Sequence, residues 1–519
     1  MSRQINILEY LENIVSVCPD KICYANEKEG YTFRQVYDCA RAIGTFLYYR
    51  GHYKKPVVVF MKKHPKEIIA FLGVVYAGDY YVPIDEEMPV HRIELIFGNL
   101  SPEAVICDET TVGLLKKFNY KGNVYLYDDI VKTAPDDSAL REIFDKAIDT
   151  DPIYVVFTSG STGVPKGVVA CHRSVIDYIE SFSEVLGINS GTVFGNQTPL
   201  YVDASLKEIY PTLKFGATAY IIPKELFMFP VKLVEFLNEK KINTICWVVP
   251  ALTMISGLGV FDKIKPEYLH TIAFGSEVFP MKQFLLWRKA LPNAKFINLY
   301  GPTEATGMSC YYVVDREFTE NDVIPIGRPF RNTDIILLDE ENKPAAPGEP
   351  GEICIRGTSL TLGYYRDFER TSEVFVQNPL NDLYPELIYR TGDIGKYNER
   401  GELVFLSRKD YQIKHMGHRI ELGEIEAAIG RMDGIINACC IFDDVNKKIV
   451  LYYTGDCPKT DVISFAKEKL PRYMIPHVVE KLDAMPLTTN GKINRLLLKE
   501  KYMNEKKGAE KNGSINKNS

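Results

Sequence analysis

The chain has 519 residues, with 62 basic and 68 acidic side chains and a formal net charge of −6. Its hydrophobic content of 46% and charged content of 25% are ordinary for a globular protein. These values exclude a disordered chain, a collagen and a small disulfide scaffold. The slight acidic excess also argues against general nucleic-acid binding, which usually needs a basic face. We therefore expect a globular protein of several domains that does not act on nucleic acids.

The cysteines and the N-terminal segment favour a cytoplasmic protein. The 11 cysteines are scattered without a C-x-x-C pair, and the neighbours Cys439 and Cys440 lie in an apolar stretch that predicts a buried strand. The N-terminal residues carry charges in every turn and lack the apolar core of a signal peptide. Residues 242–261 are uncharged and long enough to span a bilayer, but their Asn, Thr, Pro and Gly residues predict a buried strand, a loop and a short helix. No membrane association is expected.

Short apolar strands alternate with amphipathic helices through most of the chain. Residues 57–61 predict a buried strand, and residues 65–77 predict a helix that ends at Gly78. Further strands are predicted at 104–107, 124–127, 154–157 and 219–222. This alternation indicates an α/β fold in which layers of sheets and helices build a large N-terminal body.

A change of composition near residue 410 predicts a domain boundary. Residues 401–406 predict a strand, and the charged stretch that follows leads to a helix whose apolar side chains recur at helical spacing between Ile425 and Met432. The final residues have no apolar periodicity. We expect a large body at 1–409, a small α+β lid domain at 410–503 and a disordered tail at 504–519.

The segment TSGSTGVPKG, residues 158–167, combines hydroxyl side chains and glycines with Lys166 directly after a predicted strand. Glycines and hydroxyls let backbone N–H groups approach phosphate oxygens, and a lysine adds positive charge. The segment departs from the G-x-x-x-x-G-K-[ST] loop because Pro165 replaces the second glycine and Gly167 replaces the last hydroxyl. A surface turn would explain glycine and serine alone, but the lysine behind a strand favours phosphate binding.

This segment resembles the phosphate loop of the adenylate-forming superfamily, which includes acyl- and aryl-CoA ligases, luciferases and amino-acid adenylation enzymes. Further segments resemble the family's motifs in the family's order, and the resemblance extends over roughly residues 5–500. They are 76–85 (YAGDYYVPID), 203–205 (DAS), 298–306 (NLYGPTEAT), 351–364 (GEICIRGTSLTLGY), 389–393 (YRTGD), 407–426 (SRKDYQIKHMGHRIELGEIE) and 486–495 (PLTTNGKINR). The resemblance implies a ligase that uses ATP and Mg²⁺ to activate a carboxylic acid.

The resemblance also implies roles for the nucleotide-binding residues. Tyr300 would stack on adenine, and the two oxygens of Asp393 would accept the ribose hydroxyls. Arg408 would either lie near the ribose and phosphate or be a surface arginine. The other expected nucleotide contacts are Thr158, Ser159, Gly160, Ser161, Thr162, Gly163, Lys166, Asn298, Gly301 and Thr303.

Catalysis, by the same resemblance, needs charge neutralisation and a moving lid. Glu304 would hold Mg²⁺ on the triphosphate, and Lys166 and Lys492 would neutralise charge as the adenylate forms. A hinge at Asp410 would then let the lid rotate, so that a thiol attacks the activated carbonyl. Outside this context, Glu304 would be a solvated acid and Lys492 a solvated lysine. The histidines show no metal-ligand spacing, so no structural zinc is expected.

Asp203 points to an amino-acid substrate, because family members that activate amino acids pair the matching carboxylate with the α-ammonium group. The alternative is that Asp203 caps the helix that begins at Ala204. The implied side-chain pocket consists of Ala204, Lys207, Cys246, Ala273, Gly275, Leu299, Gly307 and Met308. An inward Lys207 would favour an acidic or polar side chain, whereas an outward Lys207 would leave a small apolar pocket suited to alanine.

The expected partner is a separate carrier protein that offers a phosphopantetheine thiol, because no segment after the lid resembles a carrier domain. The chain resembles stand-alone adenylation domains of nonribosomal peptide synthesis and D-alanine–carrier-protein ligases, although residues 407–419 depart from the latter. A monomer is the default expectation. The alternatives are an acyl- or aryl-CoA ligase that uses free CoA, and a nucleotide-binding regulatory protein without chemistry. Retention of Lys166, Glu304, Asp393 and Lys492 argues against the regulatory protein.

Overall fold

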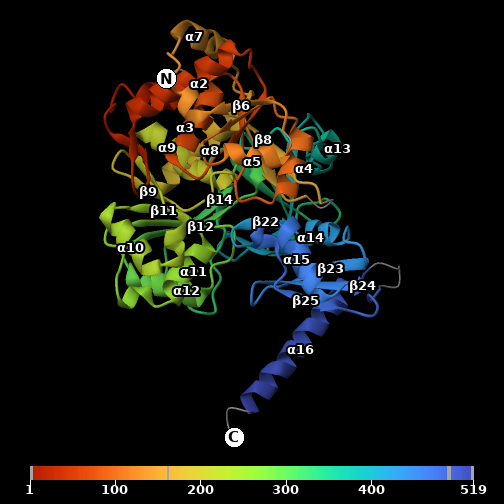
Figure 1. Ribbon diagram of the computed structural model, residues 1–519. Helices are drawn as coiled ribbons and strands as arrows, with labels where there is room; N and C mark the ends of the chain where they lie inside the picture. Colours follow the sequence, from red (N-terminus) through yellow and green to blue (C-terminus); the bar gives the residue numbers. More distant parts are fainter. Residues whose placement is uncertain (1–3, 119, 161–162, 488–492, 516–519) are drawn as a thin grey trace. The chain divides into compact units, whose positions relative to one another are not determined.

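The computed structural model describes residues 4–118, 120–160, 163–487 and 493–515 (Figure 1). The chain divides into two compact units. The large unit comprises Met1–Glu87, Phe97–Phe157 and Gly167–Lys409, and the small unit comprises Met88–Ile96, Thr158–Lys166 and Asp410–Ser519. The small unit therefore combines the C-terminal part of the chain with two short segments from its N-terminal half.

A nine-stranded sheet in the large unit has the order β15-β14-β13-β12-β11-β9-β10-β1-β2. The strands from β13 to β1 in this order are parallel, whereas β2, β14 and β15 pair antiparallel at the edges. Their bounds are β1 (Ile22–Ala25), β2 (Gly30–Thr32), β9 (Val193–Asn196), β10 (Thr218–Ile221), β11 (Thr244–Val248), β12 (Thr271–Gly275), β13 (Lys295–Tyr300), β14 (Cys310–Val313) and β15 (Arg328–Pro329).

A second sheet has the order β6-β5-β3-β4-β7-β8. Its strands are β3 (Pro56–Phe60), β4 (Tyr80–Pro83), β5 (Ala104–Cys107), β6 (Asn123–Leu126), β7 (Pro152–Thr158) and β8 (Lys166–Cys171). All five residues of β3 are buried, because helices cover both faces of a parallel sheet and its strands are therefore apolar throughout. The predicted strands at 57–61, 104–107, 124–127, 154–157 and 219–222 correspond to β3, β5, β6, β7 and β10, and the predicted α/β fold is confirmed.

Helices pack against both sheets; Figure 1 shows α11 and α12 beside β11 and β12 in green. The helices of the N-terminal part are α1 (Glu9–Ile14), α2 (Phe33–Tyr49), α3 (Pro65–Tyr76), α4 (Val90–Leu100), α5 (Val112–Leu115), α6 (Tyr127–Ile130), α7 (Asp137–Lys146) and α8 (His172–Leu186). Those that follow are α9 (Leu206–Phe215), α10 (Pro230–Glu239), α11 (Val249–Gly257), α12 (Met281–Ala290) and α13 (Phe368–Val374). Short 3₁₀ helices are η1 (Lys116–Phe118), η2 (Asp203–Ser205), η3 (Lys224–Met228), η4 (Val260–Asp262) and η5 (Thr303–Ala305).

Residues 242–261 form β11, α11 and the start of η4. The predicted strand and short helix are confirmed, but α11 begins at Val249 directly after β11 ends at Val248, without the predicted loop between them. Across the part of the chain that the structure describes, no helix is both long and apolar enough to cross a membrane.

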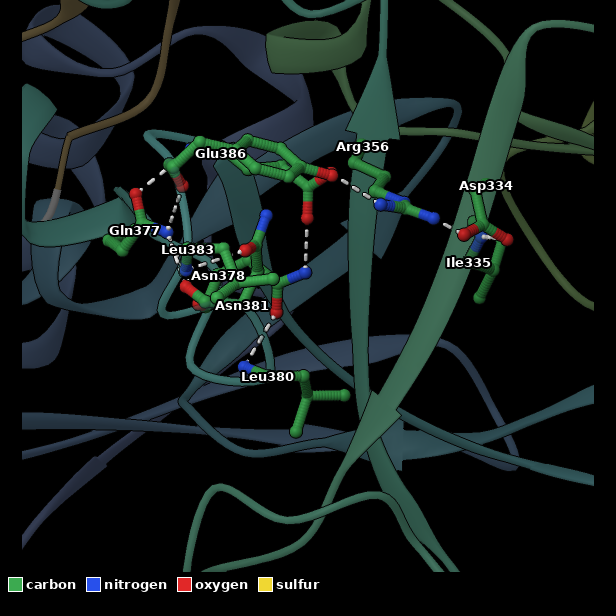
Figure 2. Close-up of polar contacts among 10 residues, drawn as sticks. Asp334, Ile335, Arg356, Gln377, Asn378, Leu380, Asn381, Leu383 and Glu386 are labelled. Atoms are coloured by element: carbon green, nitrogen blue, oxygen red, sulfur yellow. Dashed lines mark hydrogen bonds and ion pairs between the residues drawn. The ribbon is translucent and has the colours of Figure 1, made fainter.

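A five-stranded sheet contains β16 (Thr333–Leu338), β17 (Gly351–Gly357), β18 (Phe375–Gln377), β19 (Leu387–Tyr397) and β20 (Leu403–Arg408). A polar network orders the loop that connects β18 to β19 (Figure 2). Arg356 bridges Asp334, at 2.8 Å from Nε to Oδ2, and Glu386, at 2.5 Å from an Nη atom to Oε1. Asn378 donates from Nδ2 to the other oxygen of Glu386 over 2.6 Å. The network holds the start of β19, the strand that carries Asp393.

The small unit contains the hairpin β21 (Gln412–His415) and β22 (His418–Glu421), the sheet of β23 (Ile435–Asp443), β24 (Lys448–Gly455) and β25 (Val478–Lys481), and the helices α14 (Leu422–Ile429), α15 (Lys459–Lys469), η6 (Arg472–Met474) and α16 (Arg495–Ile515). One face of α14 packs with β23 and β24 in an apolar core around Ile425, Cys440 and Leu451. Cys439 and Cys440 lie in β23, which confirms the predicted buried strand.

Helix α16 differs from the expectation for the C-terminal tail. The composition predicts no ordered structure after residue 503, but the helix continues to Ile515. Leu498 and Tyr502, one turn apart, pack with residues of β23 and β24, and Lys506 pairs with Asp443 at 3.2 Å. Tertiary contacts therefore anchor a helix that the search for apolar periodicity missed.

Candidate functional site

The turn after β13 carries Glu304, whose side chain is 0% exposed. Gly301 begins the turn, and a Cβ atom there would lie 2.4 Å from the backbone oxygen of Gly307, so the chain can close on itself only with glycine. Tyr364 donates from its hydroxyl to Glu304 Oε1 over 2.7 Å. The Thr361 N–H donates to the Glu304 backbone oxygen over 3.0 Å. Glu304 is therefore not a solvated surface acid.

The site around Glu304 offers a single carboxylate. It suits Mg²⁺ bound together with a nucleotide better than it suits a metal ion bound by protein side chains alone. Among the described residues, no group of three or more His, Cys, Asp or Glu side chains could hold a metal ion. Mg²⁺ is commonly bound through one or two carboxylates together with substrate phosphates and water. A single buried carboxylate matches this mode of coordination, so Glu304 would hold Mg²⁺ in the presence of a nucleotide.

Asp393 lies in β19 with a hydrogen-bond donor on each oxygen. Its side chain is 3% exposed, and Oδ2 accepts from the Tyr300 hydroxyl over 2.5 Å while Oδ1 accepts from Arg408 over 2.6 Å. Arg408 is also the register partner of Asp393 across β19 and β20. Burial raises the pKa of Tyr300, and the nearby charge of Asp393 raises it further, so the phenol remains a donor.

This geometry refines two expectations from the resemblance. Arg408 pairs with Asp393 instead of facing solvent as a surface arginine. Asp393 would bind ribose through the lone pairs that Tyr300 and Arg408 leave open, because each carboxylate oxygen accepts more than one hydrogen bond. Asn298 also lies on β13 and donates from Nδ2 to the Pro325 backbone oxygen over 2.8 Å; its predicted contact with nucleotide stays a prediction.

The predicted anchor for an α-ammonium group, Asp203, lies in η2. Burial raises the pKa of Asp203, whereas the charge of Lys207 and a hydrogen bond from Thr303 act in the opposite direction. Thr303 and Glu304 both belong to η5, so the tertiary structure brings the two predicted carboxylates to neighbouring positions. Ala204 follows Asp203 within η2.

Lys207 lies in α9 and is only 4% exposed. The next residue, Glu208, is likewise buried, and Asn196 donates from Nδ2 to its Oε2 over 3.3 Å. Burial raises the pKa of Glu208 to about 7, although Lys207, Asn196 and Lys63 each lower it. The burial of Lys207 excludes the alternative in which it points to solvent, and its contact with a substrate side chain stays a prediction.

Four of the remaining predicted pocket residues lie on neighbouring strands, whereas Gly307 and Met308 lie between η5 and β14. Cys246 on β11 pairs in register with Ala273 on β12, and Gly275 pairs with Leu299 on β13. Cys246, Ala273, Leu299 and Met308 belong to one apolar cluster. Gly275 has no side chain, which leaves room for the Leu299 backbone oxygen.

Several buried polar atoms near this cluster have no hydrogen-bond partner among the described residues. They include the Tyr178 hydroxyl, Glu208 Oε1 and Asn196 Oδ1. The pKa of Tyr178 is raised by burial and by the charges of Cys246, Asp203 and Glu208, which places these groups close together. Its ring also packs against Gly307, at 3.2 Å from the position of a Cβ atom. Buried polar groups normally have partners, so a polar ligand would complete this region.

The phosphate-loop candidates lie in the small unit. Ser159 Oγ donates to the Arg419 backbone oxygen over 2.8 Å, and the Gly160 N–H donates to Glu424 over 3.1 Å. Glu424 also forms a buried ion pair with Arg92, another residue of this unit. The Gly160 N–H therefore already binds an anionic oxygen, which is the property that a phosphate site needs. Gly163 has a left-handed backbone with φ 81°, and Lys166 is buried at the start of β8.

Other predicted residues of the small unit are placed less completely. Ser161, Thr162 and Lys492 lie outside the described residues. Asp410 accepts a hydrogen bond from the Gln412 N–H over 3.1 Å, and its role as hinge stays a prediction. Met416 and Gly417 both have positive φ, at 51° and 80°, as a tight hairpin turn requires.

Sequence reasoning missed Tyr364, Glu208 and Tyr178. Tyr364 stands in the motif GEICIRGTSLTLGY without an assigned role, and Glu208 directly follows Lys207 in the sequence. A tyrosine in a helix gives no local signal of its partners, so Tyr178 was not predictable from the sequence pattern.

Comparisons with known proteins identify the family of the chain. The family model described as AMP-binding enzyme matches residues 11–365, and the model described as AMP-binding enzyme C-terminal domain matches residues 424–492. Tyrocidine synthase 1 of Brevibacillus parabrevis is 30% identical over 501 residues, which are 95% of this chain and 45% of the relative. Gramicidin S synthase 1 of Brevibacillus brevis is 31% identical over 511 residues, which are 96% of this chain and 44% of the relative. The chain thus spans less than half the length of these relatives.

Solved structures share the fold. The holo form of PA1221, described as a nonribosomal peptide synthetase protein with adenylation and PCP domains bound to a vinylsulfonamide inhibitor, has a TM-score of 0.82 at 24% identity and covers 95% of this chain and 84% of its own. A mutant o-succinylbenzoate CoA synthetase of Bacillus subtilis has a TM-score of 0.82 at 18% identity and covers 96% of this chain and 98% of its own. At these identities the likeness shows the fold alone.

Proposed function

The chain belongs to the AMP-binding enzyme family of acid–thiol ligases, and from this we propose that it activates an amino acid as an aminoacyl-AMP at the expense of ATP. The proposal continues with transfer of the aminoacyl group to the phosphopantetheine thiol of a separate carrier protein. The relatives, named as tyrocidine and gramicidin S synthases, support the amino-acid branch of the family.

One observation carries the amino-acid assignment: Asp203 is linked through Thr303 to the turn that holds Glu304. An α-ammonium group bound at Asp203 would place the neighbouring carboxylate of the same substrate beside the predicted metal site. A charge-assisted hydrogen bond between ammonium and carboxylate is strong where water is excluded. An acid without an amino group would leave Asp203 buried with only the charge of Lys207 opposite it and without the ammonium hydrogen bond, at a cost in binding.

The residues of the large unit supply binding and orientation. Asp393, held by Tyr300 and Arg408, would bind the ribose, and Glu304 would hold Mg²⁺. When bound, Mg²⁺ would neutralise charge on the triphosphate.

Lys166 and Lys492 would add positive charge as the carboxylate attacks the α-phosphorus and pyrophosphate leaves. The Asp410 hinge would then let Lys492 withdraw before the thiol attacks.

Burial of Lys207 extends the proposal to the substrate's side chain. The ammonium lies near Glu208 and Cys246, in a region where Glu208 Oε1, Asn196 Oδ1 and the Tyr178 hydroxyl have no hydrogen-bond partner within the described chain. A side chain with a carboxylate or another hydrogen-bond acceptor would pair with Lys207. Alanine in either chirality is the weaker candidate, because a methyl group offers no acceptor to this ammonium.

The test is ATP–pyrophosphate exchange with the purified chain and a panel of substrates. The panel contains L-amino acids, common D-amino acids including D-alanine, and dicarboxylic and simple acids without an amino group. Exchange with glutamate, aspartate or their amides, lost in Asp203→Ala, is the expected result. Exchange restricted to acids without an amino group would instead favour the CoA-ligase alternative.

The second half-reaction needs a separate measurement. Activated substrate is offered to a holo carrier protein and, in parallel, to free CoA, and thioester formation is followed by mass spectrometry. Loading of the carrier without loading of CoA is expected. Transfer to CoA alone would contradict the carrier assignment but leave the adenylation step intact.

A further inference from the structure

Residues 359–365, here called the clasp, connect two parts of the proposed site within the large unit. On one side the clasp pairs with β8: the Leu362 N–H donates to the Val169 oxygen over 2.8 Å, and the Val169 N–H donates to the Gly363 oxygen over 3.0 Å. On the other side it holds the turn after β13, because Thr306 donates from its hydroxyl to the Ser359 oxygen over 2.7 Å. The clasp therefore joins the strand that follows the phosphate loop to the turn that carries Glu304.

Two contacts of the clasp reach Glu304 itself. The Thr361 N–H binds the backbone oxygen over 3.0 Å, and the Tyr364 hydroxyl binds Oε1 of the side chain over 2.7 Å. The first contact fixes the backbone of Glu304, and the second fixes its carboxylate. A buried carboxylate needs hydrogen-bond donors, and a phenol that donates to an ionised oxygen forms a stronger bond than one between neutral groups.

Tyr364 is itself held rigidly. Its N–H donates to Thr371 Oγ1 over 2.9 Å, and its ring meets Phe375 edge to face at a centroid distance of 6.4 Å. The preceding Gly363 has φ 98°, and a Cβ atom there would lie 2.4 Å from Thr371 Cγ2. The glycine thus lets α13 approach and aim the phenol at Glu304.

We propose that Tyr364 is a positioning residue that orients the Glu304 carboxylate for Mg²⁺–nucleotide binding. The inference rests on the proposed function, in which Glu304 holds Mg²⁺. Hydrogen-bond partners of metal-binding carboxylates fix their orientation, and loss of such a partner typically weakens metal binding roughly 10–100-fold. Tyr364 needs no contact with the substrate to act in this way.

The test compares Tyr364→Phe with Tyr365→Phe. The two substitutions remove the same atom from neighbouring residues, but the Tyr365 hydroxyl makes long contacts of 3.5 Å to Tyr80 and to the Leu100 oxygen. The affinity of a non-hydrolysable ATP analogue is measured by calorimetry with Mg²⁺ and with EDTA, and the ratio of the two Kd values reports the contribution of the metal. Pyrophosphate exchange against Mg²⁺ concentration is measured in parallel.

The expected result is that Tyr364→Phe reduces the Mg²⁺-dependent gain in affinity by about tenfold, leaves binding in EDTA unchanged and shifts the exchange reaction to higher Mg²⁺. Tyr365→Phe behaves like the unsubstituted protein. An unchanged ratio in Tyr364→Phe would overturn the inference. A loss that is equal with Mg²⁺ and with EDTA, together with a lower melting temperature, would also overturn it, because it would show a structural role.

Glu304→Gln separates this inference from the proposed function. If Glu304→Gln abolishes the Mg²⁺-dependent gain while Tyr364→Phe retains it, the inference about Tyr364 fails alone. If Glu304→Gln retains the gain, the assignment of the metal to Glu304 fails, and the inference fails with it.

Discussion

Lys207 and Glu208 are adjacent residues of opposite charge, both buried in the same helix. Such groups are rarely taken out of water without a partner or a function. Lys207 lowers the pKa of Glu208, and burial raises it. The two side chains are therefore close together in a buried region, where a change in the charge of one has a large effect on the pKa of the other. At the scale of the residue, this pair is the feature that most directly bears on substrate choice.

The substitution Lys207→Met tests this pair through substrate selectivity. Loss of the ammonium should raise KM for an amino acid with an acidic side chain by about tenfold or more, because a charge-assisted hydrogen bond is lost. Exchange with small apolar amino acids should fall less or rise. KM values for both classes are measured by pyrophosphate exchange.

The matched control is Lys214→Met in the last turn of the same helix, where the lysine pairs with Glu180. This control should keep the selectivity of the unsubstituted protein. Equal selectivity in both variants would show that Lys207 does not contact the substrate's side chain.

Helix α9 illustrates how an element with ordinary helical sequence becomes buried nearly throughout. Its residues from Leu206 to Leu213 are buried, and Pro211 lies within it. The Thr212 hydroxyl donates to the Glu208 backbone oxygen over 2.6 Å, a bond to the carbonyl four residues earlier that threonine side chains form within helices. The helix therefore places Glu208 away from water although its local sequence does not require it.

The burial of Glu208 predicts a pH dependence of stability. Its pKa is raised to about 7 in the folded protein from an ordinary value of 4.5. The folded state therefore binds the proton more tightly, and the stability that this proton contributes is present below pH ~4.5 and is lost as pH rises through about 7. The substitution Glu208→Gln removes this contribution.

Urea unfolding of Glu208→Gln and of the unsubstituted protein at several pH values between about 5 and 8 measures the effect. The variant should gain on the order of 2 kcal/mol relative to the unsubstituted protein as pH rises across this window. A difference that does not change with pH would show that Glu208 titrates normally in the folded state.

The whole molecule is built from segments that are distant in sequence. The small unit contains Met88–Ile96 and Thr158–Lys166 together with Asp410–Ser519, and the Arg92–Glu424 pair links two of these segments. The proposed reaction adds a requirement for movement, because adenylation and thiol transfer make different demands on the same lid.

The substitution Lys492→Ala tests the role of the lid in the first half-reaction. Pyrophosphate exchange should fall by about a hundredfold or more, while transfer from chemically supplied aminoacyl-AMP to the carrier should persist. Circular dichroism and thermal unfolding should be unchanged, because the residue stands in a polar Asn-Gly context. Exchange kinetics like those of the unsubstituted protein would contradict the assignment.

The sequence by itself determined the elements with strong local patterns and the order of the motifs. The strand at 57–61 and the helix at 65–77 were predicted within one residue of β3 and α3, because apolar runs and a glycine stop act over short distances. The α/β fold was predicted from the alternation of apolar strands and helices, and the family and the kind of reaction were predicted from motifs, such as residues 158–167, that resemble those of the adenylate-forming superfamily in the same order.

The tertiary structure alone decided the pairings between distant residues. Tyr300 and Asp393 are 93 residues apart, and Tyr364 and Glu304 are 60 apart. The inward position of Lys207 likewise depends on which face of α9 the sheets cover. The spacing of apolar side chains along the chain specifies a helix or a strand. Which polar atoms form contacts depends instead on how these elements pack against each other, and the local sequence does not show that packing.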